Sequence, residues 1–208
     1  MLSFFKATPR SEPAQTTCKA EKSSQKYFNE VIALGHSCIS LGFEGVEAVL
    51  LCHGTPFANN RKLLAEDIEV MDAIGTCAEK YIVCGHTHIQ GVICKGEKTV
   101  LNAGAVGVPM YAPGKAQYMI LSSGENGWDY EFFSVEYDVE RTIAELKESE
   151  LWKKSPYWCR ITEHLLKTGE VAHGDVLNLV RKIYDGDSAW YDIDESYWEQ
   201  ALKMLGVM

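Results

Sequence analysis

The fold of this chain is decided by two stretches, Val49-Leu-Leu-Cys-His-Gly-Thr-Pro56 and Tyr81-Ile-Val-Cys-Gly-His-Thr-His88. Each begins as a run of strand-forming residues and stops abruptly at glycine and histidine. Such a run predicts a buried strand, and the residues after it form the loop at the strand's carboxyl end. Ligands of α/β proteins bind at that edge of the sheet. We therefore expect an α/β fold in which neighbouring strands bring His53, His86 and His88 to one point.

The spacing of these histidines favours a metal site. His86 and His88 are two residues apart, so an extended backbone would project both side chains to the same side. Neutral imidazoles on one face, with Gly54 and Gly85 beside them for close approach, suit a transition metal. His53 taken alone is better explained as a turn residue, as a single histidine beside a glycine usually is. The Gly-His-Thr-His tetrapeptide favours ligation, because two turn histidines rarely recur at that spacing.

Three segments resemble, in order and spacing, three successive motifs of the calcineurin-like metallophosphoesterases: Cys52-His-Gly-Thr-Pro56, Gly85-His-Thr-His-Ile-Gln90 and Leu101-Asn-Ala-Gly-Ala-Val-Gly-Val-Pro109. The last is similar to the family's Asn-Pro-Gly-Ser-Val-Gly block, with Ala103 and Ala105 in place of Pro and Ser. The resemblance runs from about Gly42 to about Tyr137 and is greatest to the compact bacterial phosphodiesterases.

This resemblance implies a metallophosphoesterase-type αββα sandwich with two divalent transition-metal ions (Mn, Fe, Ni or Zn) at the strand ends. It implies that His53 and His86 bind the second metal and His88 the first. Metals placed in this way activate a water molecule for in-line attack on a phosphodiester or nucleotide. The backbone around Asn102 and Gly104 would line the substrate pocket, because glycine lets the chain approach a ligand closely.

The family pattern contains three further motifs upstream, Asp-x-His, Gly-Asp and Gly-Asn-His, and this sequence has none of them. No aspartate precedes Asp67, so no upstream aspartate can bridge two metals. Three imidazoles alone lack the anionic oxygen ligands that hard cations prefer. The sequence therefore predicts the C-terminal half of a metallophosphoesterase, a truncated metal-dependent hydrolase. The alternatives are an inactive remnant or regulatory module of the same fold, and a mononuclear site with all three histidines on one ion.

We expect three regions along the chain. Residues 1–41 would comprise a polar leader and an unassigned segment, since residues 6–26 have the composition of a disordered chain. Residues 42–137 would form the phosphoesterase part, and residues 138–208 a helical extension. The alternative of an inactive remnant also predicts an exposed sheet edge, because half of the sandwich is missing, and with it self-association.

Within these regions, hydrophobic periodicity predicts the individual elements. A hairpin should turn at Glu44-Gly45, and a helix should span Arg61–Cys77. Further strands are expected at Tyr81–Cys84, Val92–Cys94, Thr99–Leu101, Gln117–Leu121 and Tyr130–Tyr137, with a hairpin at Asn126-Gly127. Helices should begin after Asp138, near Asp175 and near Glu195, with tryptophans packed between them.

Composition limits the partners. The net charge is −9, from 20 Lys and Arg against 29 Asp and Glu, which disfavours a nucleic-acid backbone and leaves a small phosphorylated or nucleotide substrate. Seven cysteines without a secretory signal indicate a reducing, cytoplasmic location. Cys52 and Cys84 each adjoin a motif, but strand neighbours of a ligand point to the opposite face, so both are predicted core residues. No apolar stretch reaches the roughly 18 residues of a membrane span.

Overall fold

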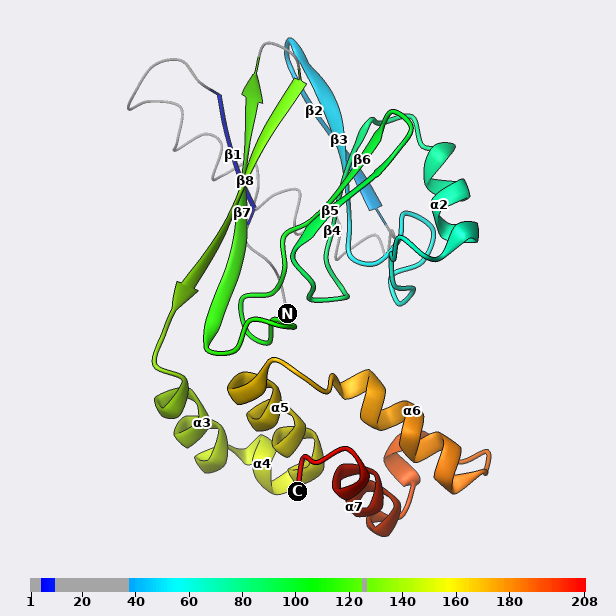
Figure 1. Ribbon diagram of the computed structural model, residues 1–208, viewed down its shortest axis with the longest axis vertical. Helices are drawn as coiled ribbons and strands as arrows, with labels where there is room; N and C mark the ends of the chain where they lie inside the picture. The colour runs from blue at the N-terminus through cyan, green and yellow to red at the C-terminus, as the bar shows by residue number, and fades with distance from the viewer. Residues whose placement is uncertain (1–4, 10–37, 125–126) are drawn as a thin grey trace. The chain divides into compact units, whose positions relative to one another are not determined.

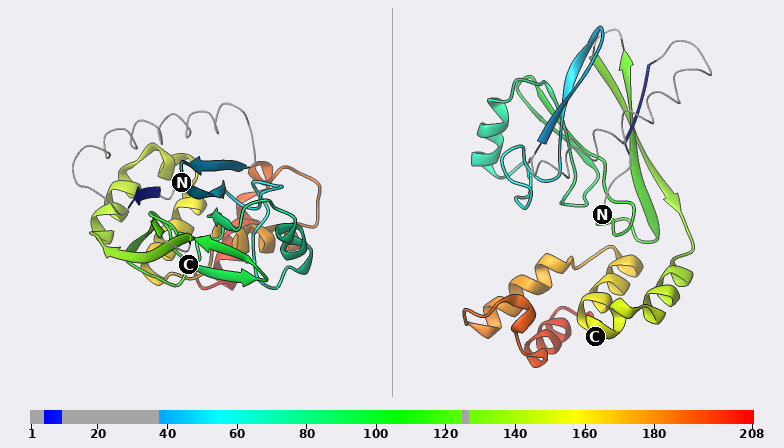
Figure 2. Two further views of the ribbon diagram at one scale, coloured as in Figure 1. Left: turned by 90° about the horizontal axis from the view of Figure 1, so that it is seen from above. Right: turned by 180° about the vertical axis from the view of Figure 1, so that it is seen from behind.

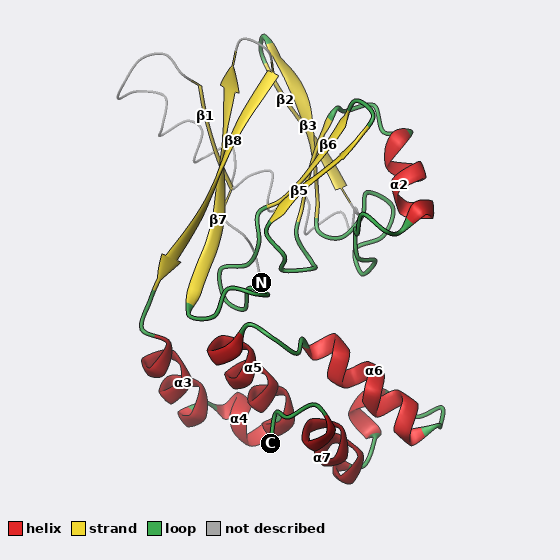
Figure 3. Ribbon diagram, viewed as in Figure 1, coloured by secondary structure: helices red, strands yellow, loops and turns green. Residues whose placement is uncertain are grey.

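The computed structural model describes residues 5–9, 38–124 and 127–208 and divides them between two compact units. The first, called here the sheet unit, lies within Met1–Val106 and Gln117–Ser134. The second, the helical unit, comprises Gly107–Ala116 and Val135–Met208. The described strands belong to the sheet unit together with one described helix, and the helical unit consists mainly of helices (Figure 3).

A five-stranded sheet carries both stretches that open the sequence argument. Its strand order is β2-β3-β4-β6-β5, with bounds Cys38–Phe43, Val46–Cys52, Tyr81–Cys84, Lys98–Asn102 and Gly91–Lys95. β3, β4 and β6 run parallel, and the hairpins β2–β3 and β5–β6 are antiparallel. Gly45 has a φ of +73° in the first hairpin turn, where glycine carries no steric penalty. The predicted hairpin and the strands over residues 81–101 are confirmed.

The second sheet has three strands in the order β1-β7-β8: Phe5–Pro9, Lys115–Gly124 and Gly127–Glu136. β1 pairs in parallel with β7. The prediction of a structureless leader is therefore wrong for Lys6–Pro9. Strand pairing is made by backbone N–H and C=O groups, which every sequence has, so amino-acid composition does not indicate it. The rest of that leader, residues 10–26, lies outside the described residues, as do residues 27–37 and residues 125–126, which include Asn126 of the predicted hairpin.

The sheet unit is layered. One face of the five-stranded sheet packs against α2 (Ile68–Gly75) through a cluster that includes Leu50, Met71 and Ile82. The opposite face packs against the three-stranded sheet through Met119, Leu121 and Trp128 among others. Figures 1 and 2 show α2 outside the larger sheet and the smaller sheet on its other side. Helix, sheet and sheet are three layers of the expected αββα sandwich.

The helix predicted over Arg61–Cys77 is shorter than expected. It begins at Ile68, where the Asp67 side chain accepts a hydrogen bond from the Val70 N–H and caps the helix. Arg61 holds the preceding loop by ion pairs with Asp67 at 3.2 Å and Glu69 at 2.8 Å. The apolar spacing before Asp67 therefore reflects a loop residue, Leu63, that is buried without helical backbone.

The helical unit contains more helices than the sequence predicted. Its helices are α3 (Val139–Glu148), α4 (Glu150–Lys154), α5 (Pro156–Thr168), α6 (His173–Tyr184), the 3-10 turn η1 (Trp190–Asp192) and α7 (Glu195–Met204). The starts after Asp138 and at Glu195 are confirmed, and α6 starts two residues before Asp175. α4 and α5 were not predicted. The predicted packing role of the tryptophans is confirmed for Trp198, which is buried in the core of this unit.

The motif that follows β6 ends inside the helical unit. Val108 and Met110 pack with Ile143 and Leu165. The Tyr111 N–H donates to the Gly169 carbonyl at 2.8 Å. The chain therefore leaves the sheet unit within the Asn102 motif and is anchored to α5 before it returns as β7. No helix in the described ranges is both long enough and apolar enough to cross a membrane.

Burial predicts the order in which the cysteines of residues 38–208 react. Cys52 and Cys84 are buried in the sheet core, and burial raises the pKa of both thiols, that of Cys84 to about 12. Cys94 is exposed on β5. Because the thiolate is the reactive form, iodoacetamide at neutral pH should alkylate Cys94 at least about tenfold faster than Cys52 or Cys84.

Peptide mass spectrometry over time measures these rates. Cys159, buried in the helical unit, reports whether that unit has opened during the reaction. Equal labelling of Cys94 and Cys52 in protein whose Cys159 is protected would contradict the assignment of Cys52 to the core.

Candidate functional site

Three parallel strand ends meet at one edge of the five-stranded sheet. β3 ends at Cys52, β4 at Cys84 and β6 at Asn102, and the three strands are neighbours in register. The Gly85 N–H donates to the His53 carbonyl at 2.9 Å, which joins the first two ends. The loops that carry the predicted residues therefore begin side by side, as expected for the carboxyl edge of a parallel sheet.

His53 and His86 are in direct contact. The Nδ1 atom of His86 lies 3.3 Å from the Nε2 atom of His53, and the ring centroids are 5.1 Å apart. Two nitrogens bound to one tetrahedral ion at about 2.0–2.1 Å are also about 3.3 Å apart. The distance between these two nitrogens therefore equals the distance between two ligands of a single transition-metal ion.

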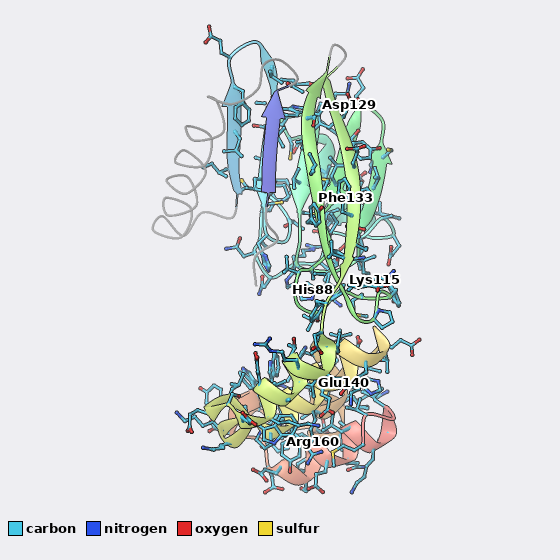
Figure 4. All side chains as sticks on the ribbon, turned by 90° about the vertical axis from the view of Figure 1, so that its left-hand side faces the viewer. His88, Lys115, Asp129, Phe133, Glu140 and Arg160 are labelled. Carbon is cyan, nitrogen blue, oxygen red and sulfur yellow. The ribbon has the colours of Figure 1, made fainter. Side chains whose placement is uncertain are left out.

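The third histidine is placed differently from the prediction. His86 and His88 both have a φ of +59°, so the extended backbone that was to project them to the same side is wrong. The strand ends at Cys84, and the Thr87 N–H folds back to the Gly85 carbonyl at 2.6 Å. Figure 4 shows His88 and Asp129 towards opposite ends of the sheet unit.

The imidazoles influence one another electrostatically. Burial lowers the pKa of His53, and the neighbouring His86 and then His88 lower it further, since each disfavours a second positive charge. His53 is thereby held in the neutral form that binds metals. Within the described residues, no three side chains of His, Cys, Asp or Glu are grouped so as to hold a metal ion. The structure thus brings two of the three histidines into contact and supplies no carboxylate to them.

Asn102 holds the two loops together. Its Nδ2 atom donates to the Gly85 carbonyl and to the Thr87 hydroxyl, each at 2.8 Å, and its Oδ1 atom accepts from the Gly104 N–H at 2.9 Å. The side chain is buried, at 8% exposure. Sequence reasoning placed Asn102 in the substrate loop, and the structure adds that its amide fixes the loop that carries His86.

Gly104 occupies a position that requires glycine. Its φ is +81°, and a Cβ there would lie 2.4 Å from Oε1 and 2.8 Å from Cβ of Gln117. The Gln117 Oε1 atom is buried and accepts no hydrogen bond from the described residues. Of the two glycines beside the histidines, Gly54 also permits a close approach, since its Cβ would meet the Asn59 and Arg61 carbonyls within 2.6 Å.

Gln90 lies in the second motif and was given no role from the sequence. In the structure it positions the loop that carries the histidines. Its Nε2 atom lies within hydrogen-bond distance of the Ala103, Tyr118 and Phe133 carbonyls, at 3.1, 3.1 and 3.3 Å. One amide thus joins the histidine loop to the Asn102 loop and to β7 and β8. The signal in the sequence was the position of this glutamine in the motif, two residues after His88.

A protein-family model for the calcineurin-like phosphoesterase superfamily domain matches residues 16–126, more than half of the chain. The chain belongs to this superfamily. The matched range begins before Gly42 and ends before Tyr137, whereas the motifs predicted a resemblance from about Gly42 to about Tyr137. The predicted αββα-type fold with C-terminal helices is thereby confirmed. Among curated proteins, none matches this chain.

Solved structures similar to this chain include three described here. A hypothetical protein from Pyrococcus horikoshii OT3 has 15% identity and a TM-score of 0.47, over 65% of this chain and 52% of its own. A metallophosphoesterase from Sphaerobacter thermophilus has 18% identity and a TM-score of 0.41, over 63% and 57%. Vps29 from Entamoeba histolytica, complexed with Zn²⁺, has 15% identity and a TM-score of 0.34, over 49% and 61%. The chain thus spans about half the length of these proteins.

The pKa of His53 gives a direct test of the histidine pair. In chelator-treated protein, an NMR titration should place the midpoint of His53 below 6.5, the ordinary value. His86→Asn should move this midpoint towards 6.5 without reaching it, because burial, the larger cause, remains. His164→Asn, on α5, is the matched control and should leave it unchanged. A midpoint at or above 6.5 in the wild type would contradict the contact.

Gly104 gives a test of the loop. Gly104→Ala should lower the free energy of unfolding through left-handed strain, about 1–2 kcal/mol, and through overlap with Gln117, about 1–3 kcal/mol more. Gly96→Ala is the control, because Gly96 has a φ of +57° but no atom within 4 Å of its Cβ position. Urea unfolding measures both losses. Equal losses in the two variants would show that Gln117 does not restrict this position.

Proposed function

We propose that this chain acts in the metal-dependent hydrolysis of a small phosphodiester or nucleotide. One observation carries the proposal: the two imidazole nitrogens 3.3 Å apart at the carboxyl edge of three parallel strands. Superfamily membership supports it, because the matching family model is that of a phosphoesterase domain.

The residues of this chain perform three tasks in the proposed reaction. His53 and His86 would hold a divalent transition metal (Mn, Fe, Ni or Zn), and His88 would extend the site to a second ion. A bound ion would supply Lewis acidity to the phosphoryl group and lower the pKa of a water molecule. Asn102 keeps the His86 loop in place, and Gly104, which packs closely against Gln117, would line the substrate pocket with its backbone.

A second candidate is an inactive or regulatory binding module of the same fold. It is favoured by the donor set, because among the described residues no carboxylate joins the histidines. Two neutral imidazoles are fewer than the three protein ligands that a catalytic zinc ion usually has. This candidate predicts a folded protein that neither retains metal nor turns over phosphoesters.

Two measurements on protein purified without chelator separate the candidates. The enzyme proposal expects bound metal by elemental analysis and hydrolysis of bis(p-nitrophenyl) phosphate with added Mn²⁺. His86→Asn should then reduce the rate by about 100-fold or more, since even outer-shell partners of a metal are worth roughly 10–100-fold. His164→Asn should retain the wild-type rate. Metal-free, inactive wild-type protein, or equal activity of His86→Asn, would reject the proposal.

A further inference from the structure

A cavity of about 160 Å³ lies beside the histidine loop in the sheet unit. Its walls come from Leu63–Ala65 in the loop before α2, from Gly91–Ile93 on β5, and from Val100 on β6. Thr87 and Asn102 complete the wall on the side of the site loops. The cavity is therefore bounded by the same two motif loops that form the candidate site.

The lining selects for a neutral, apolar ligand. Among the described residues that line the cavity, none is Asp, Glu, Lys, Arg or His. The one thiol in the wall belongs to Cys84, which is buried in the sheet core. A charged group placed there would lose its hydration without gaining a partner, whereas an apolar group gains by leaving water.

One wall is polar, and it belongs to the site. The Thr87 hydroxyl oxygen accepts hydrogen bonds from Asn102 Nδ2 at 2.8 Å and from the Ile89 N–H at 3.3 Å. These two bonds do not use the hydroxyl proton, so the hydroxyl can also donate to an acceptor atom of a ligand. Thr87 stands between His86 and His88 in the sequence, so this donor adjoins the candidate metal ligands.

The size of the cavity corresponds to one aromatic ring. An engineered apolar cavity of about 150 Å³ in another protein binds benzene. Access is provided by an apolar rim, because Ile89 and Val92 are each 37% exposed and Ala65 is exposed as well. A ring that enters between them meets Leu63 and Ile93 and reaches the Thr87 wall.

We propose that this cavity binds the single aromatic ring of an aryl phosphoester whose phosphoryl group lies at the His53–His86 loops. The inference rests on the proposed function for the identity of the phosphoryl group, but the ring subsite stands on the cavity itself. Hydrolysis would form a bond from water oxygen to phosphorus and break the bond from phosphorus to the ring oxygen. The proton released by water ends on the departing phenol, so the reaction needs no further reactant.

The test uses phenol as the probe, with chelator present and no turnover. In full-length protein with labelled Ile, Leu and Val methyl groups, phenol should shift the methyl signals of Leu63, Ile93 and Val100 saturably, with a Kd on the order of 1 mM. Val176 and Leu202, in the core of the helical unit, should not shift. Absence of shifts at the three lining residues would overturn the proposal.

A cavity-filling variant makes the test specific. Ala65→Trp should weaken phenol binding at least about tenfold, because the indole occupies the volume of the ring. Ala144→Trp, at an exposed position on α3, is the matched control and should bind phenol as the wild type does. If Ala65→Trp does not fold, Val92→Phe fills the same cavity from β5. Unchanged binding in the folded cavity-filling variant would reject the subsite.

This design separates the two proposals. Phenol binding without phosphodiester hydrolysis would retain the ring subsite and reject the enzyme proposal. Hydrolysis without phenol binding would retain the enzyme proposal and reject the subsite.

Discussion

The side chain of Asn102 is the contact on which the candidate site depends. Its amide reaches the Gly85 carbonyl and the Thr87 hydroxyl on the loop after β4, and the Gly104 N–H on its own loop. Both loops would otherwise be irregular segments, held by few backbone hydrogen bonds of their own. Because the amide is buried, each of these bonds forms in a medium where leaving it unmade costs about 1–3 kcal/mol. The position of the loop that carries His86, after β4, is therefore fixed by Asn102 at the end of β6.

Parallel register explains why these residues meet at all, and this part of the fold could be predicted from the sequence. The runs Val49–Cys52 and Tyr81–Cys84 are apolar on both faces, as strands buried between two layers must be. Strand type, strand ends and the convergence of His53 with His86 follow from that pattern. The burial of Cys52 and Cys84 follows from it too, because side chains alternate along a strand.

What the sequence could not give depends on tertiary contacts or on local backbone geometry. The predicted helix over Arg61–Cys77 is longer than the observed one. Asp67 caps the helix at a point that the spacing of apolar residues does not mark. α5 was missed because its buried residues, Cys159, Ile161 and Leu165, are interrupted by polar ones that resemble a surface loop. Gln90 and Gln117 act through carbonyls and a glycine far along the chain, so their roles appear only in three dimensions.

The backbone of the histidine loop links its structure to its proposed use. Two residues within three positions have a positive φ, and both are histidines rather than glycine, which adopts this conformation without a steric penalty. Each costs about 1–2 kcal/mol relative to an ordinary conformation. Asn102 and Gln90 supply the hydrogen bonds that hold this loop despite the strain. Glycine at either position would avoid this steric cost. The retained strain favours the proposal that the imidazole side chains themselves are needed in this loop, since strained backbone clusters at functional sites.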